Sequence, residues 1–256
     1  MVLFNVRGVK ILLRRNKKVF YIRDIDAKVA GWTAPEPPIG EVMEGKFCRL
    51  EPLSRRAHAK AIHKENSLDN TIWDYMTYGP FSQAGDYANW VESVQGGTDP
   101  LFYAIYDKER GGFGGVASFM RISPQAGTIE VGNINFSPAL QRTRAASEAM
   151  FLMMQWAFEA GYRRYEWKCN ASNLGSRRAA QRLGLSYEGI FRQALVVKGR
   201  NRDTAWFAAI DSEWPALEAA FQKWLATSNF DAAGRQKLRL SGLTAPILAA
   251  RDPILH

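Results

Sequence analysis

Hydrophobic and polar positions are most regularly patterned between Thr128 and Gly184, a stretch that is predicted to form strand, tight loop, long helix, strand and short helix. Ile129 to Phe136 is a run of apolar and β-branched residues, which is typical of a strand. Pro138 follows it and ends it, because proline cannot donate to a ladder of strand hydrogen bonds. Tyr165 to Cys169 is predicted to be the second strand, and Asn173 to Leu183 the second helix.

The long helix is predicted over Gln141 to Ala160, which is rich in Ala, Met, Leu and Glu. Its polar residues Glu148, Gln155 and Glu159 share one narrow face, and the remaining positions are apolar. Such a helix is expected to lie buried against a sheet. Gly161 ends it in the manner of a C-terminal cap.

The rest of the chain supplies further strands and helices around this stretch. Further strands are predicted over Phe47–Leu53, Leu101–Tyr106, Phe113–Ile122, Leu185–Val197 and Asp203–Ile210. Helices are predicted over Ser54–Glu65, Leu68–Met76, Gln83–Gln95 and Ser212–Ala226, with Ser54 and Ser212 as caps. Hairpins come first and β-α-β units follow. This order predicts an α/β fold: a mixed, mostly antiparallel seven-stranded sheet with helices on both faces and one splayed central parallel strand pair.

The two ends of the chain are predicted to lie outside the main domain. Residues 1–43 are interpreted as an N-terminal extension and a Pro-rich linker, since Pro35, Pro37 and Pro38 favour extended chain. The basic run Leu12–Lys18 could belong to a strand pair, a surface hairpin or a loosely tied extension, and it does not resemble a signal peptide. Residues 44–211 are predicted to be the functional domain, and residues 212–256 a C-terminal helix with a basic tail.

The formal net charge of +9 favours an anionic partner, but the basic residues are scattered, so no nucleic acid is expected. Cys48 and Cys169 fall in predicted strands and are interpreted as buried thiols in a reducing cytoplasm. His58 and His63 are five residues apart on one predicted helix and face different sides, so no metal site is predicted. The absence of an 18-residue apolar run predicts no membrane span.

The candidate chemistry lies where the first strand joins the long helix, at Leu140 to Ala146. A helix start carries unpaired N–H groups and partial positive charge, which bind phosphate readily. Arg142 and Arg144 flank this start, where cations oppose the helix dipole unless an anion is bound. The alternative interpretation is that both arginines are solvated surface residues.

At this point the sequence resembles the GCN5-related N-acetyltransferases, in the branch that includes the ribosomal-protein alanine N-acetyltransferases. The resemblance spans about Glu44 to Asp211. The acetyl-CoA loop of that family reads Gln/Arg-x-x-Gly-x-Gly/Ala. Here it is the segment Gln141–Ala146, in which both end positions fit and Arg144 replaces the first glycine.

A second signature, Asn-x-x-Ser-x-x-Ala, matches at Asn173, Ser176 and Ala179. The later segment Gly199–Thr204 also resembles the final hairpin of this branch. Many members of the wider family use a tyrosine as the acid, but the matching position here is Ala180.

The resemblance implies a function and a set of cofactor-binding residues. It implies transfer of an acetyl group from acetyl-CoA to a primary amine by direct attack, with Ser176 as the acid that protonates the thiolate. The alternative is a non-catalytic relative that binds CoA, or an interaction module. Asn173 is expected to bind the cofactor, to cap its own helix, or both. The cofactor-binding set is Phe136, Ser137, Gln141, Arg142, Thr143, Arg144, Ala145, Ala146, Asn173 and Ser176.

Glu130 is the candidate base, because an acid on a central strand is unfavourable unless it is paired or functional. It could instead form a salt bridge, with Arg121 as the candidate partner, and a chain of waters could act as the base.

The acceptor site is expected at Trp73, Asp74, Tyr78, Phe81 and Asn133, although aromatic clusters of this kind are usually core. A peptide N-terminus, an amino acid, an antibiotic and a polyamine all remain open as the acceptor. A monomer or a homodimer is expected.

Overall fold

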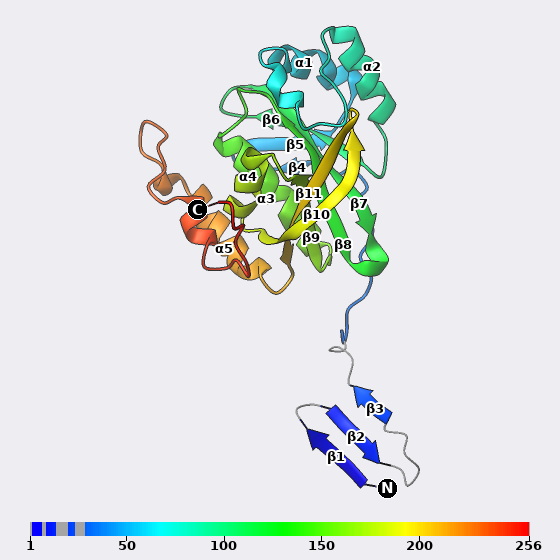
Figure 1. Cartoon of the computed structure of the whole chain (residues 1–256). Coiled ribbons are helices and arrows are strands. Elements are labelled where there is room, and N and C mark those ends of the chain that lie inside the picture. The colour runs from blue at the N-terminus through cyan, green and yellow to red at the C-terminus, as the bar shows by residue number, and fades with distance from the viewer. Residues whose placement is uncertain (1, 7–8, 14–19, 24–28, 256) are drawn as a thin grey trace. The chain divides into compact units, whose positions relative to one another are not determined.

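The structure is a computed structural model that describes residues 2–6, 9–13, 20–23 and 29–255. It divides into two compact units, 1–33 and 34–256. The first contains β1 (Val2–Val6), β2 (Val9–Leu13) and β3 (Phe20–Arg23), which form an antiparallel sheet in the order β1-β2-β3 (Figure 1). The charged part of the basic run, residues 14–18, lies outside the described residues.

The second unit is built on one mixed sheet. Within its described residues the sheet has eight strands, in the order β10-β11-β9-β8-β7-β6-β5-β4. All neighbouring pairs are antiparallel except β8 and β9. The predicted mixed α/β fold is confirmed, with one short strand, β4, added at the edge. The strands are β4 Met43–Glu44, β5 Cys48–Pro52, β6 Leu101–Asp107, β7 Gly112–Ser123, β8 Thr128–Phe136, β9 Arg164–Asn170, β10 Ser186–Val197 and β11 Arg200–Ile210.

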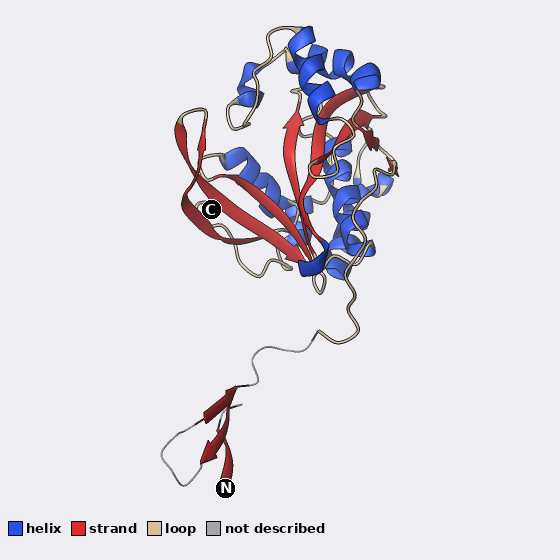
Figure 2. Cartoon of the chain, turned by 90° about the vertical axis from the view of Figure 1, so that its right-hand side faces the viewer, coloured by secondary structure: helices blue, strands red, loops and turns tan. Residues whose placement is uncertain are grey.

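Helices cover both faces of this sheet (Figure 2). The helices are η1 Arg55–Ala59, α1 Lys60–Asn66, η2 Asn70–Trp73, α2 Ala84–Val94, η3 Pro124–Ala126, α3 Arg144–Glu159, α4 Leu174–Arg182, α5 Trp214–Leu225, η4 Thr227–Asn229 and α6 Leu240–Thr244. Successive side chains of β6 therefore enter two different hydrophobic clusters, because strand side chains alternate between faces. Leu101, Tyr103 and Ile105 join the cluster under α3, whereas Phe102 and Ala104 join the cluster under α1 and α2.

The central parallel pair separates along its length. β8 and β9 are paired from Thr128 and Arg164 only as far as Val131 and Trp167. Just beyond this point, β8 contains a bulge against β7, and Asn133 takes a left-handed φ of 51°. A bulge bends its strand and increases the local twist. The two strands consequently diverge toward their C-terminal ends.

Three predicted helices differ from the structure, and one of them is the long helix, which begins at Arg144 instead of Gln141 because Thr143 holds the cap position. Leu68–Met76 is not an α-helix, and only η2 forms there. The Asp69 carboxylate accepts from the Thr71 amide at 2.8 Å and from the Thr71 hydroxyl at 2.7 Å, which starts a tight turn instead. The predicted Ser212 cap is also wrong, because α5 begins at Trp214 and Glu213 holds the cap position.

Glu148 was expected on the polar face of the long helix, but it is buried. Its carboxylate accepts hydrogen bonds from the backbone amides of Lys46, Phe47 and Cys48, at 2.9, 2.6 and 2.8 Å. A carboxylate that accepts several amide protons is well compensated for its burial. Glu148 thus ties α3 to the start of β5.

The chain after α5 folds back against α4. Arg177, which is 1% exposed, forms a two-pronged ion pair with Asp252, with both N–O distances at 2.6 Å. The Asp252 amide donates to the Gln181 side chain at 2.8 Å, and the Thr244 hydroxyl donates to the Arg182 carbonyl at 3.1 Å. The segment after α5, called the tail below, therefore holds α4 in place through Thr244 and Asp252. No helix in the described part of the chain is long and apolar enough to cross a membrane.

Candidate active site

A cleft of about 800 Å³ opens where β8 and β9 diverge. Its walls come from η2 and the loop after it, the second half of β8, the start of α3, the end of β9, and α4, with Arg202 of β11 and Gln236 added. Beyond Val131, β8 has no described strand partner on its β9 side, so backbone groups are available to a ligand there.

The first turn of α3 forms one end of the cleft. The Thr143 hydroxyl accepts from the Ala146 amide at 3.0 Å and so caps the helix. Among the described residues, no acceptor is found for the amides of Arg144 and Ala145, so this start has N–H groups to offer an anion. Arg142 lies on the cleft wall and has a left-handed φ of 62°. Strained backbone of this kind is costly for a residue other than glycine and concentrates at functional sites.

Arg144 points away from the cleft, unlike Arg142. Its guanidinium pairs with Glu109 and lies between two aromatic rings, 4.8 Å from the Phe47 centroid and 4.7 Å from that of Phe230. Its exposed side-chain fraction is 24%. Arg144 therefore joins the tail to the sheet edge and does not supply charge to the cleft.

Ser176 lies on the cleft wall at the first turn of α4. The Asn173 side chain accepts from the Ser176 amide at 3.0 Å and caps the helix. The Trp167 indole N–H donates to the Ser176 hydroxyl oxygen, also at 3.0 Å. Burial raises the pKa of the neighbouring Cys169 thiol, and a hydrogen bond from Ser176 opposes that rise. Ser176 thus holds a fixed position between the sheet and the opening.

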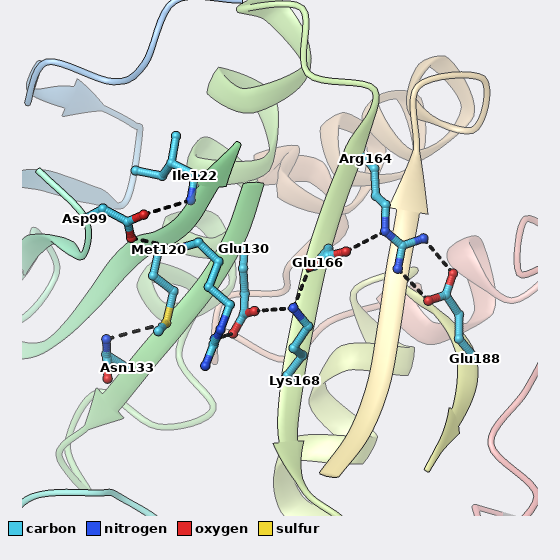
Figure 3. A network of polar contacts seen from close by, with 10 residues as sticks. Asp99, Met120, Ile122, Glu130, Asn133, Arg164, Glu166, Lys168 and Glu188 are labelled. Atoms are coloured by element: carbon cyan, nitrogen blue, oxygen red, sulfur yellow. Dashed lines mark hydrogen bonds and ion pairs between the residues drawn. The ribbon is translucent and has the colours of Figure 1, made fainter. Parts of the chain in front are cut away.

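Glu130 is buried at 2% exposure in a chain of charges that runs across β8 and β9 (Figure 3). Arg121 lies 2.6 Å from one carboxylate oxygen and Lys168 lies 2.8 Å from the other. Lys168 also contacts Glu166 at 2.6 Å, and Glu166 in turn pairs with Arg164. Burial raises the pKa of the Glu130 carboxyl, and Lys168 and Arg121 oppose that rise. Glu130 does not itself line the cleft, whereas Lys168 does.

The loop around η2 forms the opposite wall and is held in place from two sides. The Asn135 side chain accepts from Asn66 at 3.1 Å and donates to the Ile72 carbonyl at 3.3 Å. The Tyr75 hydroxyl donates across the cleft mouth to the Ser172 carbonyl at 3.2 Å. This wall is therefore anchored both to β8 and to the loop before α4.

The cleft includes part of the set expected from the sequence. The expected residues on its wall are Phe136, Gln141, Arg142, Ala146, Asn173, Ser176 and Asn133. Those that lie off the wall are Ser137, Thr143, Arg144, Ala145, Glu130, Trp73, Asp74, Tyr78 and Phe81. The three aromatic residues of this second group pack in the cluster under α1 and α2, where Tyr78 stacks on Trp90 at 4.5 Å.

Four basic residues on the wall were missed by the sequence reasoning: Lys168, Arg178, Arg182 and Arg202. A signal existed for two of them, since Arg178 and Arg182 recur four residues apart on the helix that carries Ser176. Arg182 donates to the Ser147 hydroxyl at 3.1 Å, and burial lowers the pKa of its guanidinium. Within the described residues, no group of three or more His, Cys, Asp or Glu side chains is placed to hold a metal ion.

A family model for the acetyltransferase (GNAT) domain matches residues 48–186. The chain therefore belongs to the GNAT acetyltransferase family. It is 24% identical over 151 residues to an uncharacterized N-acetyltransferase, YnaD, of Bacillus subtilis, a match that covers 59% of this chain and 86% of that protein.

Solved structures agree with this assignment. A GCN5-related N-acetyltransferase from Brucella melitensis has a TM-score of 0.82 at 44% identity and covers 84% of this chain and 99% of its own. A GNAT-family protein from Chromobacterium violaceum has a TM-score of 0.70 at 38% identity, over 75% of this chain and 96% of its own. An acetyltransferase from Salmonella typhimurium that modifies the N-terminal serine of a 50S ribosomal subunit protein shares the fold, with a TM-score of 0.56 at 22% identity over 66% and 99%.

Proposed function

We propose that the protein transfers an acetyl group from acetyl-CoA to a primary amine by direct attack of the amine on the thioester carbonyl. The observation that carries this proposal is that one cleft contains both an anion-binding helix start with Arg142 and a fixed hydroxyl, Ser176, at the divergence of β8 and β9. These two features match the two demands of the reaction, which are to bind a phosphorylated cofactor and to protonate the thiolate leaving group.

The residues at the α3 end fit a CoA ester. Acetyl-CoA, when bound, supplies an activated acetyl group and several phosphates. The amides of Arg144 and Ala145 would receive phosphate at the helix start, and the Arg142 side chain would add charge. Arg182 lies on the same wall and would add a second guanidinium. Beyond Val131, the edge of β8 that faces β9 has no described strand partner, and its backbone would form hydrogen bonds with the amide groups of acetyl-CoA.

Ser176 would act as the acid. The Trp167 indole can only donate, so this contact uses an acceptor lone pair of Ser176 and leaves the hydroxyl proton for the neighbouring Cys169 sulfur or for the sulfur of the cofactor. As the C–N bond forms and the C–S bond breaks, Ser176 would donate its proton to sulfur so that CoA leaves as a thiol, and Ser176 would regain a proton from solvent. The proton lost by the amine passes to water that contacts the Lys168–Glu130 pair, so Glu130 would act through Lys168 and solvent instead of touching the amine.

Within the family, we place the protein near the ribosomal-protein alanine N-acetyltransferases on its Asn173, Ser176 and Ala179 pattern. We expect it to act in the cytoplasm as a monomer or homodimer, without metal or nucleic acid.

The test is acetyl-CoA consumption by the full chain in the presence of a panel of amines, followed by thiol detection, with mass spectrometry of the acetylated product. Thiol release that depends on an added amine is the expected result. Calorimetry with CoA is run beside it. Measurable CoA binding without thiol release for any amine would overturn the enzymatic function and favour a CoA-binding module.

A further inference from the structure

Three residues on one face of β11 carry buried polar atoms that lack a hydrogen-bond partner among the described residues. They are Arg202, Thr204 and Trp206, through Nε, Oγ1 and Nε1 respectively. Residues two apart along a strand share a face, and Ala205 and Phe207, on the opposite face of β11, enter the main core. Buried polar atoms normally find a partner, so an unpartnered group on a cleft wall indicates a ligand contact.

Arg202 is the member of this set that reaches the cleft. Its Nε is buried without a hydrogen-bond partner, and its guanidinium is in no ion pair within the described part of the chain. The neighbouring cations differ in this respect, since Arg121 and Lys168 are both paired with Glu130. Burial lowers the pKa of the Arg202 guanidinium and the nearby Arg121 lowers it further, whereas Cys169 and Glu130 raise it only in part, so an added anion would favour the charged guanidinium.

The charge on the cleft wall is strongly one-sided. Its described lining holds five basic residues but one carboxylate, that of Asp69, which already accepts from Thr71. Arg142 lies in the loop before α3, Arg178 and Arg182 lie on α4, and Lys168 is neutralised by its ion pairs. Arg202 is therefore a basic residue of the described lining that comes from β11 and has no ion pair of its own.

Arg202 also lies close to the reacting atoms. Its charge acts on the Cys169 thiol, and the same thiol is the hydrogen-bonding neighbour of Ser176. On the neighbouring strand, Lys168 and Asn170 pair with Trp206 and Thr204 and line the cleft from the same face. Arg202 and Ser176 thus line one cleft, in which an amine that attacks beside Ser176 could place an anionic group at Arg202.

We propose that the acceptor amine carries a carboxylate and that Arg202 binds this carboxylate. The fork of a guanidinium matches the two oxygens of a carboxylate. The inference rests on the proposed acetyl transfer and narrows its substrate class. The carboxylate comes either from a free amino acid or from an acidic side chain near a peptide N-terminus.

The experiment compares amines that differ only in this group. Alanine is tested against alaninamide, and the peptide amide Ala-Glu-NH₂ against Ala-Gln-NH₂, with thiol release by the full chain as the readout. Loss of one partially or fully desolvated charge-assisted contact is expected to lower kcat/KM by about 10- to 100-fold. We expect the carboxylate member of at least one pair to be favoured by that factor, and the pair that responds identifies the source.

Arg202→Gln, which keeps donors but removes charge, should abolish the preference, whereas Arg202→Lys should retain part of it. The matched control is Arg192→Gln, which removes an exposed cation on β10 away from the cleft and should retain the full preference. Melting temperature and CoA affinity verify that each variant is folded. Equal turnover of both members of both pairs overturns the carboxylate site and leaves acetyl transfer standing. No turnover of any amine overturns the acetyl transfer, and the carboxylate site with it.

Discussion

The indole N–H of Trp167 donates to the hydroxyl oxygen of Ser176 at 3.0 Å, across the opening between β9 and α4. The contact fixes the direction of the hydroxyl group without using its proton. It also holds the small side chain of Ser176 in a defined orientation at the first turn of α4. The indole is 5% exposed and belongs to the main core, so the orientation of Ser176 depends on core packing.

Ser176→Ala should lower kcat by about 10²-fold and leave the CoA dissociation constant nearly unchanged, because proton donation to sulfur is needed only as charge develops. Single-turnover acetyl transfer with a working amine, together with calorimetry, provides the two measurements. Ser212→Ala, a change at an exposed position after β11, is the control. A wild-type rate in the Ser176 variant would remove this residue from the mechanism.

Arg142→Ala should weaken CoA binding by about 1–3 kcal/mol, because a charge-assisted phosphate contact is lost. Arg144→Ala should affect CoA binding much less and lower the melting temperature instead, since Arg144 pairs with Glu109 and lies between Phe47 and Phe230. Calorimetry at two salt concentrations separates the variants, and the Arg142 contact should weaken at higher salt. Equal losses of CoA affinity in both variants would contradict this division of roles.

Asp252→Ala should lower the free energy of unfolding by about 3–5 kcal/mol, because it leaves Arg177 buried without its counter-ion. Denaturant unfolding measures the effect. Asp231→Ala is the control, since it removes the partner of Arg235 in a pair whose arginine side chain is 81% exposed. If Asp252→Ala and Asp231→Ala lowered the free energy of unfolding by similar amounts, the buried ion pair would not be what holds the tail in place.

Glu166→Gln should make the protein less stable at pH 7, and the difference from wild type should shrink as the pH falls. Burial alone would raise the pKa of the Glu166 carboxyl, but hydrogen bonds from Arg164 and Lys168 outweigh it and hold the pKa below its ordinary value of 4.5. A depressed pKa means that the carboxylate contributes stability above 4.5, which is lost as the pH falls through the lower folded-state value.

Denaturant unfolding of both proteins between pH 7 and pH 3 gives the measurement for Glu166→Gln. The matched change Glu218→Gln, in an exposed hydrogen bond with Gln222 on α5, should change the free energy of unfolding only slightly. A constant difference for Glu166→Gln across this range would mean that its pKa is not depressed.

Removal of the residues before Gly31 should leave the melting temperature of the 34–256 unit and its CoA affinity unchanged, because that unit has its own core and contains the whole cleft. Thermal unfolding and calorimetry of the truncated chain provide the check. An insoluble product would count against the predicted domain boundary.

The fold was largely predictable because its elements are encoded by local patterns. Thr128–Phe136 reads as a strand from its β-branched run, and Arg144–Glu159 reads as a helix from its composition. The extent of η2 was not predictable in this way, because the Asp69 side chain competes with helical hydrogen bonds. Leu68–Met76 contains helix formers, but one carboxylate decides its geometry.

The cleft was only partly predictable, because the direction of a long side chain depends on residues far along the chain. Arg142 and Arg144 look equivalent in the sequence, yet Arg144 is drawn away by Glu109, 35 residues earlier. Glu148 looks like a surface residue of a helix but binds amides about a hundred residues away. Arg202 was missed because nothing in the sequence shows which basic residue lacks a carboxylate partner.

The ion pair between Arg177 and Asp252 joins positions 75 residues apart, and this separation bears on hydrogen exchange. Local opening that releases the tail also releases the rear of α4, so the amides of both segments should exchange as one cooperative unit. A ligand that binds only when α4 is in place stabilises this closed state. The free energy of opening of the tail must then rise by the same amount, and its amides exchange more slowly. Residues 240–252 would report occupancy of a cleft whose walls they do not form, which makes their amide protection a readout of cofactor binding at a distance.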